Sequence, residues 1–229
     1  MDEAASEPVP IDVDDTTRVS GLLLCPPRPD ACYVLAHGAG AGMRHPFMES
    51  VASGLAALGI ASLRYQFPYM EQHAKRPDSP ARCHATVRAA VAAARRRVPT
   101  LPLIAGGKSF GGRMTSQAQA AQALEDIRGL VFLGFPLHAP KQPSDSRAEH
   151  LLQVRIPMLF LQGARDEFAE STLIHALVER LGQRATLKVL PDADHSFHVP
   201  VRSGRTDAEV QADMLRAVVD WTLALISPE

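Results

Sequence analysis

A serine between glycines stands where an apolar run gives way to a helical pattern, and this feature constrains the chain most. The segment is Gly106-Gly107-Lys108-Ser109-Phe110-Gly111-Gly112. It follows the apolar run Leu101–Ala105 and precedes a helix-like stretch from Arg113 to Leu124. It contains the pattern G-x-S-x-G, in which small neighbours let a strained serine stand clear of a sheet. The sequence therefore predicts an exposed serine hydroxyl at a strand-to-helix turn.

Two later residues give this short pattern a context, since a Gly-rich turn alone is a weak signal. The apolar strand Met158–Leu161 is followed by Asp166, and the strand Ala185–Leu190 is followed by His195. Ser109, Asp166 and His195 thus occur in the chain order that a hydrolytic triad on a parallel sheet requires, each just past a strand. This order favours a nucleophile at Ser109 over a plain turn residue.

A second glycine-rich loop lies upstream. The apolar strand Cys32–Ala36 runs into His37-Gly38-Ala39-Gly40-Ala41-Gly42. Glycines there allow backbone N–H groups to approach a developing oxyanion. This loop is the expected partner of the serine turn.

With these motifs the chain resembles the α/β-hydrolase superfamily from about Ile11 to Ile226. It is similar to the small lidless group that includes dienelactone-hydrolase-like proteins, and most similar to a hydrolase-like family grouped around a testis-expressed mammalian protein. The segments that carry the resemblance are Ala36-His37-Gly38-Ala39-Gly40, His45-Pro46-Phe47-Met48, Gly106-Gly107-Lys108-Ser109-Phe110-Gly111-Gly112-Arg113 and Asp194-His195-Ser196-Phe197. Dienelactone hydrolase itself uses cysteine where this chain has Ser109, so its substrate is not carried over.

The resemblance implies acyl transfer to water, with a small carboxylic ester or thioester as substrate. His195 takes the proton of Ser109, and Asp166 holds the imidazole in the productive tautomer. The backbone N–H of Phe110 and one from the Ala39-Gly40 loop stabilise the oxyanion. The sequence leaves open which of those two loop residues points inward. No cofactor or metal is expected.

Other side chains compete for the acid and base positions. Asp166 could instead cap the following helix, and Glu167 is then the nearest substitute. His198 competes with His195, but His195 directly follows the Asp192-Ala193-Asp194 turn.

Three further polar residues accompany these motifs. We expect His37 to be a structural hydrogen-bonding residue. Lys108 is expected to be an exposed cation that could tune or gate the pocket or have no function. Arg113 could bind a substrate carboxylate or pair within the fold.

Other functional classes fit less well. Gly107-Lys108-Ser109 resembles the end of a P-loop, but that motif needs glycine where Pro102 stands. His195 and His198 lack the spacing of the H-E-x-x-H zinc motif. A catalytically silent interaction module with the hydrolase fold remains the alternative, because a fold alone does not prove activity.

Composition agrees with a single enzyme domain. The chain has 229 residues, 46% of them hydrophobic, and a formal net charge of −1, which gives no reason to expect nucleic acid or an anionic membrane as a partner. The acidic start lacks the features of a secretory signal. Three cysteines leave an odd thiol and no paired framework, so we expect a reduced, cytoplasmic location. The expected partner is a small-molecule substrate.

Strand and helix patterns alternate along the chain. Ile11–Val13 and Val19–Leu24 predict a small antiparallel pair, and the later strands a mostly parallel sheet with helices on both faces. We expect a loose tail at residues 1–10 and a single domain over residues 11–229.

The interval between the strands ending at Phe135 and beginning at Met158 is too short for a cap domain, so the pocket should be open. Its expected wall residues are Arg44, His45, Phe47, Phe67, Pro68, Tyr69, Leu137, His138, Phe168 and Phe197.

Overall fold

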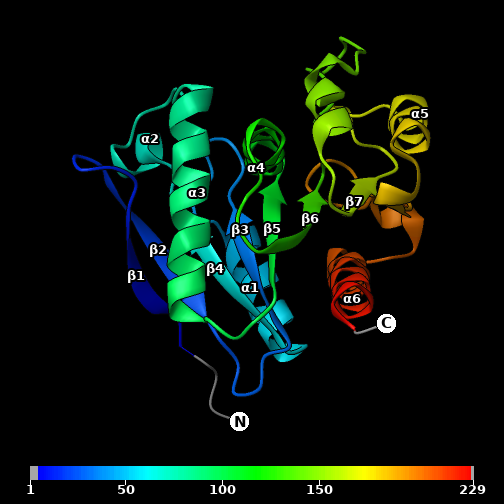
Figure 1. Cartoon of the computed structure of the whole chain (residues 1–229). Helices are drawn as coiled ribbons and strands as arrows, with labels where there is room; N and C mark the ends of the chain where they lie inside the picture. Colours follow the sequence, from blue (N-terminus) through cyan, green and yellow to red (C-terminus); the bar gives the residue numbers. More distant parts are fainter. Residues whose placement is uncertain (1–4, 228–229) are drawn as a thin grey trace.

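The computed structural model describes residues 5–227, which are built around one eight-stranded sheet (Figure 1). The strands lie in the spatial order β1-β2-β4-β3-β5-β6-β7-β8. β2 is antiparallel to both of its neighbours, whereas all pairs from β4 to β8 are parallel. This confirms a mostly parallel sheet that starts with an antiparallel pair. The strands are β1 Glu7–Asp12, β2 Arg18–Leu24, β3 Ala31–Ala36, β4 Ile60–Tyr65, β5 Leu103–Lys108, β6 Ile127–Leu133, β7 Met158–Gly163 and β8 Ala185–Leu190.

Local sequence signals set the starts of the two longest helices. The Ser79 hydroxyl accepts a hydrogen bond from the Arg82 N–H at the start of α3. Thr206 and Glu209 form a reciprocal capping box at the start of α6. The helices are α1 Pro46–Ala57, α2 Pro68–Glu71, α3 Pro80–Arg97, α4 Phe110–Ala121, α5 Ser171–Leu181 and α6 Asp207–Ile226, with 3-10 helices η1 Ser146–Gln153, η2 Gly182–Arg184 and η3 Val201–Ser203.

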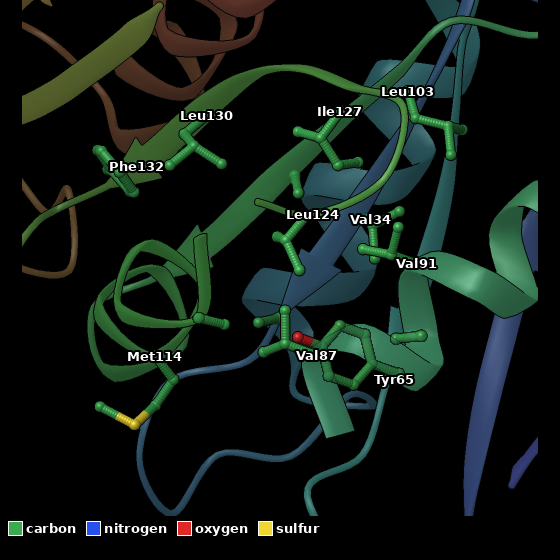
Figure 2. Packing of buried hydrophobic residues seen from close by; sticks show 14 of the residues in the cluster. Val34, Tyr65, Val87, Val91, Leu103, Met114, Leu124, Ile127, Leu130 and Phe132 are labelled. Atoms are coloured by element: carbon green, nitrogen blue, oxygen red, sulfur yellow. The ribbon is translucent and has the colours of Figure 1, made fainter. Parts of the chain in front are cut away.

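Two hydrophobic layers hold these helices against opposite faces of the sheet. One layer packs α3, α4 and α5 against the sheet. Figure 2 shows part of it, including Val87 and Val91 of α3, Met114 of α4, and Val34 and Phe132 of the sheet. The other layer packs α1 and α6, and its members include Met48, Leu55, Met214, Tyr33 and Leu159. The predicted cover of helices on both faces is confirmed.

The first strand begins earlier than the sequence suggested. Residues 7–10, expected to be tail, belong to β1, and Val9 and Ile11 are buried. Pro8 and Pro10 weakened the strand signal. β1 lies at the sheet edge, where proline is tolerated because its missing N–H can face away from the partner strand. The remainder of the expected tail includes residues 1–4, which lie outside the described residues.

The connection from β6 to β7 contains loop segments and the 3-10 helix η1, and no cap domain, within the described chain. This confirms the expectation that the interval is too short for a cap domain. Helix α2 was not predicted.

Among residues 5–227, no helix combines the length and the apolar character needed to cross a bilayer.

Candidate active site

Ser109 lies on the sharp turn between β5 and α4, in a backbone conformation that is strained for a side chain. Its φ is 48° and its ψ is −112°. Helix α4 begins directly at Phe110, earlier than the predicted start at Arg113. The turn depends on close backbone approach, because a Cβ at Gly107 would lie 2.3 Å from the Ala36 carbonyl oxygen. A Cβ at Gly111 would lie 2.5 Å from the carbonyl oxygen of His37, the residue that follows β3.

Three side chains from separate loops form a continuous hydrogen-bonded chain. His195 Nε2 lies 2.8 Å from Ser109 Oγ, and His195 Nδ1 lies 2.7 Å from Asp166 Oδ2. With the carboxylate ionised, Nδ1 donates to Asp166 and Nε2 is left to accept the serine proton. These three residues, separated by up to 86 positions along the chain, are brought together.

Asp166 is held by more than the histidine. Its side chain is fully buried, and its Oδ1 accepts a hydrogen bond of 2.8 Å from the Phe168 N–H. The amide nitrogen of Gln162 donates to Oδ2, while its amide oxygen accepts from the Phe135 N–H. Gln162 was missed by the sequence analysis. Its place at the end of an apolar strand, four residues before Asp166, was the available signal.

The competing side chains lie elsewhere. Glu167 is exposed and takes no part in the hydrogen bonds at His195. His198 Nδ1 is 2.8 Å from Asp207 Oδ2 at the surface, and this hydrogen bond raises the pKa of His198. Within the described part of the chain, no three His, Cys, Asp or Glu side chains are arranged to hold a metal ion.

His37 fixes the conformation of the loop after β3. It is buried, and burial lowers the pKa of its imidazole to about 4 although the Gly38 carbonyl acts in the opposite direction. Nε2 accepts a hydrogen bond from the Phe67 N–H, so the neutral ring must donate from Nδ1 to the Gly38 carbonyl oxygen, 2.7 Å away. The structural role expected for His37 agrees with these contacts.

The two candidate loop donors differ in their partners. The Gly40 N–H donates to the hydroxyl of Tyr69, on helix α2, at 3.0 Å. The N–H groups of Ala39 and Phe110 have no hydrogen-bond acceptor among residues 5–227. Ala39 shares its peptide unit with the Gly38 carbonyl that His37 holds, so the Ala39 N–H points away from His37.

An open pocket of about 350 Å³ lies over Ser109. His45, Phe47 and Phe168 line it, as predicted. The complete lining is Gly38, Ala39, Ala41, His45, Phe47, Met48, Lys108, Ser109, Phe168, His195 and Ser196.

The other expected wall residues do not line this pocket. Phe67, Tyr69 and Phe197 are buried beneath the loops, and Phe197 stacks under Phe47 at 5.9 Å between ring centroids. Leu137 and His138 line a separate hollow beside η1. The sequence placed these residues near strand ends correctly but did not indicate which way their side chains point. Arg44 and Pro68 also fall outside the lining.

Lys108 is more buried than the sequence predicted. It is half-buried, and its ammonium donates a hydrogen bond to the His195 carbonyl oxygen. Burial lowers the pKa of Lys108 to about 8. Arg113, by contrast, packs its guanidinium 6.0 Å from the Phe110 ring centroid and does not line the pocket.

Comparison with known proteins adds to this geometry. A family described as an alpha/beta hydrolase domain matches residues 29–223. A dienelactone hydrolase from Anabaena variabilis superposes with a TM-score of 0.75 at 18% identity, over 97% of this chain and 98% of that one. XC6422 from Xanthomonas campestris, described as a serine hydrolase without lid, gives 0.72 at 23% identity, over 98% and 97%. The esterase domain of a Rhodothermus marinus protein gives 0.71 at 14% identity, over 94% and 97%.

Proposed function

The chain belongs to the alpha/beta hydrolase family, and from this premise we propose that it cleaves a small carboxylic ester or thioester through an acyl-enzyme on Ser109. The observation that carries the proposal is the hydrogen-bonded chain from Ser109 through His195 to Asp166 at the base of an open pocket. Neighbours described as an esterase and a dienelactone hydrolase support it. The likeness to the testis-expressed family stays a prediction, as does a cytoplasmic location.

The proposed reaction has two steps with the same proton carrier. His195 Nε2 takes the proton from Ser109 Oγ as the oxygen attacks the substrate carbonyl, and then gives it to the leaving alcohol or thiol. In the second step water attacks the carbonyl of the acyl-enzyme while His195 takes a proton from it. His195 then returns a proton to Ser109 Oγ as the acid leaves. Asp166 stabilises the imidazolium that forms in each step.

The geometry favours Ala39 over Gly40 as the second oxyanion donor. The Gly40 N–H is already engaged by Tyr69, whereas the Ala39 and Phe110 N–H groups have no acceptor among residues 5–227. We propose that the substrate oxyanion accepts from these two. His37 acts through the peptide unit that it holds, so it is a positioning residue.

The open pocket supports a small substrate. No cap domain within the described residues buries a long acyl chain, and the pocket volume of about 350 Å³ matches a small ligand. The proposed catalytic unit is a single domain.

The deciding experiment compares wild type with Ser109→Ala. Hydrolysis of a panel of small esters and thioesters should be abolished, as should labelling by a fluorophosphonate probe. Loss of a triad serine costs on the order of 10⁶ in kcat in a well-studied serine protease. Full activity in a folded Ser109→Ala variant would overturn the triad. A folded wild type that neither labels nor hydrolyses would favour the silent interaction module.

A further inference from the structure

The proposed mechanism leaves the Lys108 ammonium without a role, although Lys108 directly precedes the proposed nucleophile in the chain. Lys108 is the last residue of β5 and lines the same pocket as Ser109. Its ammonium has three donors, and in the described part of the chain one of them is used, in a hydrogen bond to the His195 carbonyl oxygen. Within residues 5–227, no ion pair joins Lys108 to an acidic side chain. Lys108 therefore combines a place in the pocket lining with a half-buried ammonium that has unused donors.

The surroundings make room for this cation. The rings of Phe47 and Phe197 stack together, with Lys108 Nζ 5.9 Å and 5.1 Å from their centroids. Gly134 leaves space on another side, because a Cβ there would lie 2.9 Å from Nζ. Aromatic faces attract a cation without using its N–H donors.

Among residues 5–227, the pocket lining contains no aspartate or glutamate, and Lys108 is its only lysine or arginine. Its other titratable side chains are His45 and His195. A substrate carboxylate would therefore meet a partly desolvated ammonium with no competing acid in the lining. Such charge-assisted hydrogen bonds are stronger than neutral ones.

We propose that Lys108 is a specificity-determining residue that binds a carboxylate carried by the ester or thioester substrate. This inference rests on the proposed hydrolase function and narrows its substrate class to acidic esters. The ammonium donates to the carboxylate while the substrate carbonyl lies at Ser109. The hydrogen bond to His195 uses one donor and is compatible with this contact.

The charge on Lys108 offers a second test of the inference, which uses the pH dependence of the wild type and needs no variant. Burial lowers its pKa to about 8, while Asp166 and Asp194 act in the raising direction. The other titratable groups at this site are His45 and His195, which line the pocket. Because the ammonium is charged only below its pKa, a preference for anionic substrates should decline as pH rises through about 8.

The test uses two matched ester pairs. Monomethyl glutarate and methyl pentanoate differ by a carboxylate on the acyl side, and 4-acetoxybenzoate and phenyl acetate differ by one on the leaving side. We expect the ratio of kcat/KM for the acidic ester to that for the neutral ester to fall roughly tenfold to a hundredfold in Lys108→Met for at least one pair. Lys108→Arg should keep most of the ratio. An unchanged ratio in Lys108→Met would overturn carboxylate binding.

Two measurements remain if Lys108→Met fails to fold. The wild-type ratio should fall above pH 8, and calorimetry should detect tighter binding of the acidic ester than of the neutral ester to Ser109→Ala for at least one of the two pairs. Equal binding together with a pH-independent ratio would overturn the inference. These results are separable from the hydrolase proposal, because binding to Ser109→Ala needs no turnover. Failure of the hydrolase proposal would appear as wild-type inactivity on all four esters.

Discussion

The Tyr69 hydroxyl accepts a hydrogen bond of 3.0 Å from the Gly40 N–H, joining helix α2 to the loop that follows β3. Tyr69 is itself held by the carboxylate of Asp78, which accepts from its backbone N–H at 2.7 Å. The loop conformation that leaves the Ala39 N–H free thus depends on a residue from another element.

Tyr69→Phe should therefore lower kcat with little change in KM. Loss of one neutral hydrogen bond is worth about 1 kcal/mol, so we expect about a fivefold fall in rate on a small ester. The matched control is Tyr33→Phe, because Tyr33 is also buried and donates to the Val131 carbonyl, within β6. Tyr33→Phe should reduce stability without affecting kcat. Equal losses of kcat in the two variants would show that the Tyr69 contact has no special effect on the reaction.

Asp166→Asn should lower kcat severely while the fold persists. An amide in place of the carboxylate no longer fixes the productive tautomer of His195, and a comparable change in a well-studied serine protease costs on the order of 10⁴. Glu167→Gln makes the same chemical change on an exposed neighbour. It should alter kcat less than twofold, because substitutions at exposed positions usually have small effects. If the larger loss came from Glu167→Gln, the acid would be assigned to the wrong residue.

Stability should decrease as pH falls below neutrality. Burial lowers the pKa of His37 to about 4, and that of His150 also to about 4. Below pH 6.5 these two histidines bind protons in the unfolded chain but stay neutral in the folded protein. The free energy of unfolding that is present above pH 6.5 is therefore lost towards pH 4. For His37 the loss between pH 7 and pH 5 is on the order of 2 kcal/mol. Urea unfolding at several pH values measures it.

Two variants test the assignment of that slope. His37→Gln should reduce the decrease in unfolding free energy between pH 7 and pH 5. His198→Gln, at an exposed position whose pKa is raised by Asp207, should leave the decrease in place. A slope that survives in His37→Gln and disappears in His198→Gln would contradict the burial argument.

Short esters should be hydrolysed better than long ones. The pocket over Ser109 is open and small, and within the described residues no cap domain buries a long chain. A series of 4-nitrophenyl esters of increasing acyl length measures kcat/KM on each side of the aggregation threshold. A rate that climbs steadily with length and jumps at that threshold would show lipase behaviour instead.

The sequence predicted the central strands β3, β4 and β7 well because their apolar runs are buried on both faces. It also predicted that Ser109, Asp166 and His195 would meet, since the carboxyl ends of parallel strands share one edge of the sheet. Their catalytic roles stay predictions. Side-chain direction was not predictable: Phe197 and Lys108 were placed near the pocket, but their burial depends on packing between distant loops. This kind of information is absent from local patterns.

Contacts through α2 could not be predicted for a related reason. That helix has a single turn, and a pattern this short carries no periodic signal. The contact from Tyr69 to Gly40 therefore became visible only in three dimensions. The predicted β1 was too short because proline has a low strand propensity, which counted against Pro8 and Pro10. At the edge of a sheet, however, proline is tolerated.

The backbone contacts at Gly107 and Gly111 have a consequence for laboratory evolution. Any side chain at either position would collide with backbone atoms of β3 or of the residue after it, so random mutagenesis there should yield mostly inactive clones. His45, Phe47 and Phe168 belong to segments outside this contact and line the pocket. A library aimed at new substrates should therefore hold the serine turn constant and diversify those three positions.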